Sequence, residues 1–166
     1  MLYTSQAIKL LTDEHDRIRG ETKVLRNLDV PQTERKLSFA RLLPILTSHT
    51  KKEEKVVYSF MKLCDQDDLR IWALEGKEEH ILMEQLIKKM LAVDISGEEW
   101  SAKAKVLAEL VDHHIDEEEQ EIFPALAKEL NENSDEQLAR NYDTQNVPEV
   151  IPRPLNTDKN VAHPYR

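Results

Sequence analysis

A histidine and a glutamate four positions apart occur twice in this chain, each time within the same longer pattern. The segment from His49 to Tyr58 reads His-x-x-x-Glu-Glu-x-x-Val-Tyr, and the segment from His114 to Phe123 reads His-x-x-x-Glu-Glu-x-x-Ile-Phe. On a helix, side chains four residues apart lie on the same face, so each pair can direct an imidazole nitrogen and a carboxylate oxygen at one cation. We therefore predict that each segment is a helix carrying half of a metal site.

His113 also begins a His-x-x-x-Glu pair, with Glu117, but only His114 places its glutamate and its aromatic residue at the same spacing as the first motif. Leu107, Leu110 and Val111 precede His114 by seven, four and three residues, which places His114 on an apolar helix face. We predict that His114 is the ligand and that His113 is exposed or lies behind the ligands.

The composition favours a helical protein. The 166 residues include three glycines, and 33% of them are charged. A chain of this length supports one domain with a core. The net charge of -9 argues against nucleic-acid binding, which needs clustered Lys and Arg. No apolar run approaches the roughly 18 residues that suggest a membrane span. The one cysteine, Cys64, cannot form an intramolecular disulfide, and the N-terminus has no apolar signal segment, so we expect a soluble protein in a reducing cytoplasm.

Apolar residues recur with a helical period in four stretches. We expect amphipathic helices at about residues 5–28, 33–64, 67–93 and 96–131. Ser5 is the expected cap of the first helix, and Ser96 with Glu99 forms a capping box for the fourth. Pro44 and Pro124 lie inside helical patterns, so we predict a kink or a restart at about 40–44 and a second kink at Pro124. The third helix has the least regular stripe, with Ile71 and Leu74 among its expected inner positions.

Four such helices with short connections predict an all-α fold, an up-down-up-down antiparallel four-helix bundle. We assign residues 1–133 to the bundle. We assign residues 134–166 to a short helix, at about 134–142, and an extended C-terminal tail that contains proline and lies along the bundle or is disordered.

Each predicted helix contributes one histidine to its apolar face near mid-length, and mid-helix positions of an antiparallel bundle share one level. Four imidazoles and two carboxylates are then expected to meet in one layer, where burial without a cation would be costly. The predicted ligands are His15, His49, Glu53, His80, His114 and Glu118.

The remaining acids and the lysine pairs are interpreted as surface. Glu84 lies four residues after His80 and is expected behind the ligands or on the surface, and His163 in the tail is not expected at the site. The side chains interpreted as solvated helix faces are Glu54, Glu78, Glu79, Glu117, Glu119, Glu121 and the pairs Lys51-Lys52 and Lys88-Lys89.

The ligand set indicates the metal. Six nitrogen and oxygen ligands without a thiolate are too many for one tetrahedral zinc and too rich in imidazole for magnesium or calcium. Two iron ions that share Glu53 and Glu118 satisfy the set, and manganese or a mixed pair fits the same ligands. Positions would remain open for dioxygen, nitric oxide, peroxide or water.

These motifs resemble the hemerythrin family, and more closely its HHE cation-binding branch. The resemblance covers about residues 5–131 and rests on Glu14-His15, His49-x-x-x-Glu53, Glu79-His80 and His114-x-x-x-Glu118. It implies a four-helix bundle with a non-haem diiron centre, the six residues above as iron ligands and the two glutamates as bridges. Position 84 is Glu, whereas oxygen-carrying hemerythrins have a second histidine there, which argues against a simple oxygen carrier.

Three functions fit the sequence. The first is a diiron protein that binds or reacts with dioxygen, nitric oxide or peroxide in stress response, sensing or iron handling, either as an enzyme or without catalysis. The second is a ferritin-like iron oxidase or storage protein, although that class uses Glu-x-x-His spacing. The third is an interaction bundle with a vestigial site. A protein partner or a homo-oligomer is compatible with each.

Overall fold

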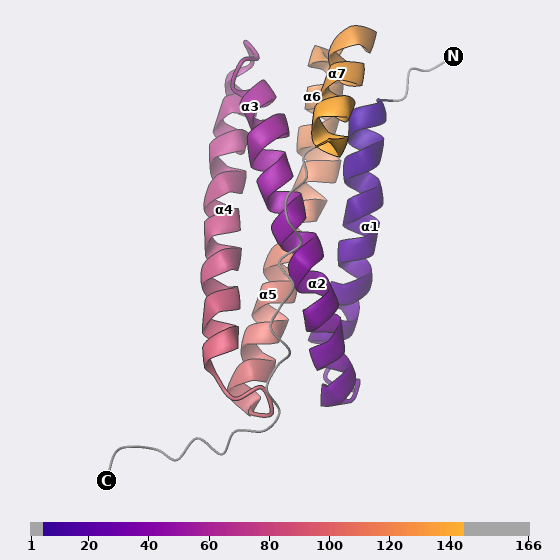
Figure 1. Cartoon of the computed structure of the whole chain (residues 1–166). Coiled ribbons are helices and arrows are strands. Elements are labelled where there is room, and N and C mark those ends of the chain that lie inside the picture. Colours follow the sequence, from indigo (N-terminus) through magenta and orange to yellow (C-terminus); the bar gives the residue numbers. More distant parts are fainter. Residues whose placement is uncertain (1–4, 145–166) are drawn as a thin grey trace.

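The structure is a computed structural model and describes residues 5–144. All secondary structure in that range is helical, as predicted. Long helical rods lie side by side, and a short helix near the end of the described chain packs beside the first helix (Figure 1). The elements are α1 (Gln6–Arg26), α2 (Gln32–Lys52), η1 (Glu53–Val57), α3 (Tyr58–Met61), α4 (Asp67–Ala92), α5 (Glu98–Glu117), η2 (Glu118–Ile122), α6 (Phe123–Glu129) and α7 (Glu132–Asp143). None of the described helices is long and apolar enough to span a bilayer.

The first helix forms as its sequence predicts. Ser5 caps α1, because its hydroxyl accepts a hydrogen bond from the backbone N–H of Ile8 at 3.1 Å. Asn27 ends the helix in an extended conformation. The buried side chains recur every three or four residues and include one histidine; they are Ala7, Leu11, His15, Ile18, Thr22 and Leu25. The apolar stripe thus carries His15 into the interior.

Both repeated motifs contain a turn of π-helix, which the sequence analysis did not anticipate. The backbone N–H of Tyr58 donates to the carbonyl of Glu53, and that of Phe123 donates to the carbonyl of Glu118, five residues back in each case. Such turns accommodate one extra residue and are frequent at functional sites. The rod formed by α2, η1 and α3 and the rod formed by α5, η2 and α6 therefore have the same irregularity at the same motif position.

Several local expectations were wrong. Helix α2 runs without a break through Pro44, so the predicted restart does not occur, while the alternative of a kink there stays a prediction. The predicted capping box of α5 does not form, because Gly97 is the N-cap and the Ser96 hydroxyl donates to Asp94 at 2.7 Å. Near Pro124, η2 ends at Ile122 and α6 begins at Phe123, and the kink predicted at Pro124 stays a prediction.

The last described helix starts earlier than expected. Asn131 caps α7 and Ser134 completes the reciprocal pair of bonds. Helix α7 packs against α1 and η1. The boundary between residues 133 and 134 stays a prediction, and the extended tail from Asn146 to Arg166, with His163, lies outside the described residues.

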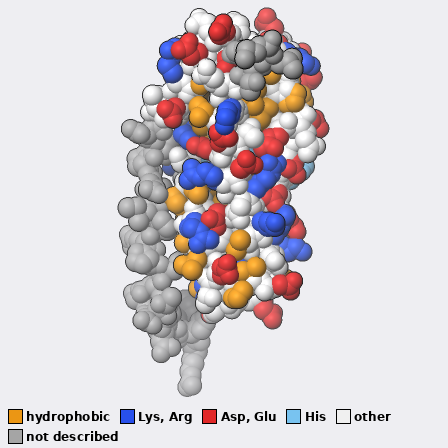
Figure 2. All heavy atoms as spheres, turned by 90° about the vertical axis from the view of Figure 1, so that its right-hand side faces the viewer, with side chains coloured by type: hydrophobic (Ala, Val, Ile, Leu, Met, Phe, Trp, Pro, Cys, Tyr) orange, Lys and Arg blue, Asp and Glu red, His pale blue; other side chains and the backbone are white. Residues whose placement is uncertain are grey.

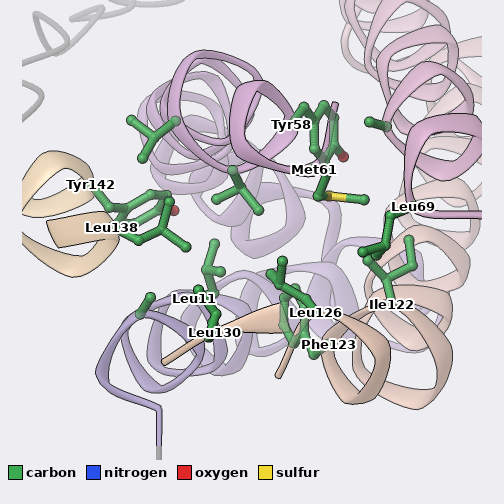
Figure 3. Close-up of a cluster of buried hydrophobic side chains, with 14 of the residues drawn as sticks. Leu11, Tyr58, Met61, Leu69, Ile122, Phe123, Leu126, Leu130, Leu138 and Tyr142 are labelled. Carbon is green, nitrogen blue, oxygen red and sulfur yellow. The ribbon is translucent and has the colours of Figure 1, made fainter. Parts of the chain in front are cut away.

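Two apolar clusters fill the interior. One contains Leu11, Tyr58, Met61, Phe123, Leu126 and Tyr142, among others, and gathers side chains of α1, α3, α6 and α7 (Figure 3). The other is built around Ile18, Phe39, Trp100, Leu107 and Val111. Along every rod, the predicted ligands fall between residues of the first cluster and residues of the second. A polar layer therefore lies between two apolar cores.

Candidate metal centre

The structure brings the six predicted ligands together in that polar layer. None of them exposes more than 5% of its surface. They are His15 on α1, His49 on α2, Glu53 in η1, His80 on α4, His114 on α5 and Glu118 in η2. Their role as ligands stays a prediction, while their convergence is a structural fact.

The ligand atoms form two groups, and within each group all atoms lie within 4.8 Å of one another. One group consists of His15, His49, Glu53 and Glu118, and the other consists of Glu53, His80 and His114. Since Glu53 belongs to both, the layer has the form of two adjoining cation sites with a shared carboxylate.

Both carboxylates face imidazoles from more than one helix. Oε2 of Glu118 lies 3.2 Å from Nε2 of His15 and 3.6 Å from Nε2 of His114. Oε2 of Glu53 lies 3.4 Å from Nε2 of His80 and 3.5 Å from Nε2 of His49. These positions suit carboxylates that bridge two cations.

Four buried atoms in this layer have no hydrogen-bond partner among the described residues. They are Nε2 of His15, Nε2 of His49, Oε1 of Glu53 and Oε2 of Glu118. Buried polar atoms are normally paired or coordinated, because burial without a partner costs free energy. Imidazole nitrogens and carboxylate oxygens that point at one another satisfy this requirement when they hold a cation. The residues present therefore fit a metal.

Every imidazole of the layer also contacts a carboxylate through its other nitrogen. The Nδ1-to-oxygen distances are 2.8 Å for His15–Glu119, 3.1 Å for His49–Glu14, 3.0 Å for His80–Glu54 and 2.6 Å for His114–Glu79. An ionised carboxylate only accepts hydrogen bonds, so Nδ1–H donates and Nε2 faces the centre, where a neutral imidazole offers its lone pair. This is the arrangement that orients histidine ligands of metals.

These four contacts form a closed ring around the bundle. In three of them the carboxylate belongs to the rod that precedes the rod of its histidine in the chain. In the fourth, Glu119 of the last rod supports His15 of the first. The ring thus ties each rod to the next at the level of the centre.

The interpretation of Glu54, Glu79 and Glu119 as solvated helix faces was wrong. Glu119 also accepts two hydrogen bonds from Arg19 at 2.8 Å. The sequence held a signal that could have identified them, because each supporting acid is adjacent to a predicted ligand. Glu54 and Glu119 follow Glu53 and Glu118, just as Glu79 precedes a histidine.

The electrostatics of the layer follow from burial and opposite charge. Burial acts to raise the pKa of Glu53, but the imidazoles of His49, His114 and His80 hold that pKa well below its usual range. Burial likewise acts to lower the pKa of His114, but Glu118, Glu53 and Glu79 raise it well above its ordinary value. The layer therefore favours ionised carboxylates next to positive charge.

The sequence analysis treated Tyr58 as part of the repeated motif but not as a site residue. Its hydroxyl donates to Oε1 of Glu118 at 3.1 Å and lies 3.4 Å from Oε2 of Glu53. Burial and the two glutamates raise the pKa of Tyr58 well above its ordinary value, so the hydroxyl keeps its proton. Its ring stacks on His80 with centroids 5.5 Å apart, and Phe123 at the equivalent motif position stacks on His15 at the same distance.

Other titratable side chains stay outside the layer. The Glu84 side chain is 66% exposed and pairs with Lys88 at 2.9 Å, which confirms a surface position. His113 is exposed and lies in a peripheral group with Glu79 and Glu117.

A groove between α2 and α4 reaches the edge of the layer. Its volume is about 510 Å³. Leu43, Leu46 and Ile87 line one part, and Thr50, Glu54 and His80 line the part beside the centre. The groove is therefore a route by which a small molecule can approach His80.

A helical bundle with two adjoining His and Glu groups defines the class of histidine–carboxylate metal-binding proteins. The sequence profile described as the hemerythrin HHE cation binding domain matches residues 6–126. The chain belongs to this family, which confirms the resemblance found in the sequence, and the family binds metal cations.

One curated relative is similar over part of its length. It is a DNA nickase from Nostoc sp. (strain PCC 7120 / SAG 25.82 / UTEX 2576), 28% identical over 108 residues, which are 63% of this chain and 29% of the relative. The chain thus spans less than a third of the length of that protein. No solved structure matches the chain significantly.

Proposed function

We propose that the chain is a non-haem diiron protein that binds or reacts with a small ligand, either dioxygen, nitric oxide or peroxide. The observation that carries this proposal is the buried layer of four Nε2 atoms and two carboxylates, four of whose inward atoms lack a hydrogen bond among the described residues. In the proposed assignment, His15 and His49 would hold one ion, His80 and His114 would hold the other, and both ions would share Glu53 and Glu118.

Iron is proposed on the chemistry of the donor set. Imidazole and carboxylate ligands suit iron, while manganese or a mixed pair fits the same atoms. Neither ligand group contains a thiol, because Cys64 lies in an apolar cluster and its thiol donates to the carbonyl of Phe60 at 3.5 Å. When bound, iron supplies open coordination positions and a change of oxidation state.

The chain itself supplies four further conditions for such chemistry. The carboxylate ring fixes the orientation of the imidazoles. The two apolar clusters restrict water on both sides of the layer. Tyr58 holds a proton 3.1 Å from Glu118, so a hydrogen-bond donor lies next to the bridging carboxylates. The groove beside His80 gives a ligand access from one side.

The short connections between consecutive rods and the contacts of α1 with α2 and α5 support the up-down-up-down order that we propose for the bundle. A role in stress response, sensing or iron handling in the cytoplasm is likewise proposed. A ferritin-like oxidase is less well supported, because here histidine precedes glutamate and the spacing is four residues.

We do not transfer DNA nicking to this chain. The relative with that name extends far beyond the matched segment, and the chain has a net charge of -9. On the face seen in Figure 2, acidic and basic side chains are interspersed, without the basic patch that a phosphate backbone requires.

The test is to purify the protein without oxygen, load it with ferrous iron, count the bound ions, and then add air or nitric oxide while recording the visible spectrum. Two irons per chain and a new absorption band are expected. The Glu118→Ala variant should lose the band, and Glu84→Ala is the matched control that should keep it. Reversal of the band on removing the ligand would indicate binding or sensing, and consumption of peroxide would indicate catalysis. A protein that binds no metal would contradict the proposal and favour an interaction bundle with a vestigial site.

A further inference from the structure

Helix α7 lies outside the residues that match the family, yet it is anchored to the bundle at both ends. At its start, the carboxylate of Asp135 accepts hydrogen bonds from the backbone N–H of Gln6 at 2.7 Å and of Ala7 at 3.1 Å. The hydroxyl of Ser5 donates to the same carboxylate. Asp135 thereby joins α7 to the first turn of α1, where unpaired N–H groups favour an anion.

At its other end, α7 places Tyr142 next to a predicted metal ligand. The Tyr142 hydroxyl donates to Oε2 of Glu14 at 2.7 Å and lies 3.0 Å from Nδ1 of His49. Tyr142 is 2% exposed. Lys52 covers it, with Nζ 4.3 Å from the ring centroid, and also donates to Glu14. The hydroxyl is therefore enclosed between the helix and the centre.

These contacts favour one arrangement of protons. Glu14, surrounded by donors, accepts from Tyr142 and from Lys52. Because the Tyr142 hydrogen is directed at Glu14, Nδ1 of His49 is left as the donor to the Glu14 carboxylate and to the Tyr142 oxygen. Nε2 of His49 then presents its lone pair to the centre. The other three imidazoles have a carboxylate on Nδ1 but, among the described residues, no tyrosine hydroxyl on that nitrogen.

We propose that Tyr142 is a positioning residue for His49 and that, through it, cation binding and the docking of α7 strengthen each other. The inference rests on the proposed function, since it needs His49 to hold a cation. If docked α7 orients His49 and raises the affinity for the cation, the bound cation must raise the stability of docked α7 by the same factor. Helix α7 then reports whether the centre is loaded.

The first experiment is a titration of the full chain with Co²⁺, in which the visible absorption of the bound ion measures binding. In the Tyr142→Phe variant, which keeps the ring beside Lys52, we expect one of the two ions to bind roughly 10-fold more weakly, as for other groups that orient histidine ligands. The cobalt spectrum should change and the helix content should not. Leu138→Ala is the comparison variant, because it leaves the hydroxyl and loosens the packing of the same helix. It should weaken cobalt binding only together with a loss of α7 protection in the metal-free protein, whereas Tyr142→Phe should weaken binding with the helix intact.

The second experiment is hydrogen exchange of the α7 amides with and without Co²⁺. Protection is expected to rise with cobalt in the wild-type protein and to rise much less in Tyr142→Phe. Unchanged exchange of α7 in the wild type upon loading would overturn the coupling. Equal cobalt affinity in the wild type and Tyr142→Phe would overturn Tyr142 as the positioning residue. A wild-type protein that binds no cobalt would instead contradict the proposed metal site.

Discussion

The Tyr58 side chain packs directly against Gly76, and a residue larger than glycine has no room at position 76. A methyl group on Gly76 would lie 2.3 Å from the Tyr58 hydroxyl oxygen and 2.8 Å from the ring carbon that bears it. From the sequence, Gly76 is expected to leave open space on its helix face, one turn before His80. In the structure Tyr58 fills that space, so Gly76 on α4 lets Tyr58 reach the carboxylates.

We expect Gly76→Ala to destabilise the protein by about 1–3 kcal/mol, the usual cost of overpacking a core. Gly20→Ala is the matched control, because nothing lies within 4 Å of a methyl group there and Gly20 is inside a helix. That variant should gain roughly 0.5–1 kcal/mol. Urea unfolding of both variants without metal measures the difference. Equal stability of the two would contradict the close fit of Tyr58.

The adjacent histidines of α5 allow a test of register. His114 is 2% exposed and lies in the layer, whereas His113 is exposed. We expect His114→Ala to lose one of two bound ions, since Nε2 of His114 is a predicted ligand atom. His113→Ala should keep both. Metal counting after gel filtration distinguishes the two variants, and a loss of metal in His113→Ala would shift the assignment to the peripheral group.

Much of the layer of predicted ligands could be predicted from the sequence. The spacing of His49 and Glu53 and the apolar stripe around His15 were sufficient to predict which side chains converge, because helical periodicity determines which side chains share a face. The π-helical turns could not be predicted from the sequence, since an apolar pattern with 3.6 residues per turn does not reveal where a turn contains one extra residue. The irregular stripe of α4 was equally misleading, as Ile71 and Leu74 are 60% and 57% exposed.

The supporting carboxylates give a third prediction. Glu119→Gln removes the ionised acceptor of His15 Nδ1 and should weaken metal binding by about 10-fold or more. The control is Glu121→Gln, which removes the same charge from an exposed position in the same π-turn. Cobalt titration of both variants separates a hydrogen-bond effect from a charge effect. If the two variants weaken binding equally, the ring acts only through its net charge.

The groove between α2 and α4 gives a fourth prediction, about access rather than affinity. Ile81 lines the groove one residue after His80. We expect Ile81→Trp to slow the reaction of the iron-loaded protein with nitric oxide while the number of bound irons stays the same. Val106→Trp is the control, since Val106 is 53% exposed on α5 and does not line the groove. Stopped-flow absorbance measures both rates. Unchanged kinetics in Ile81→Trp would mean that the ligand enters elsewhere.

Metal removal should destabilise the fold itself. The inward atoms of His15, His49 and Glu53 have no hydrogen bond among the described residues, and bound ions pair them in the folded chain only. A ligand that binds only the folded state stabilises it by about 2.7 kcal/mol when its free concentration is 100 times its dissociation constant. We therefore expect the iron-loaded protein to melt at a higher temperature than the chelator-treated protein, and readdition of Fe²⁺ without oxygen should restore the difference. The Glu53→Ala variant should show little of this shift, because it loses the carboxylate that both groups share. A wild-type melting temperature that does not respond to chelator or to iron would mean that the layer is stable without a cation.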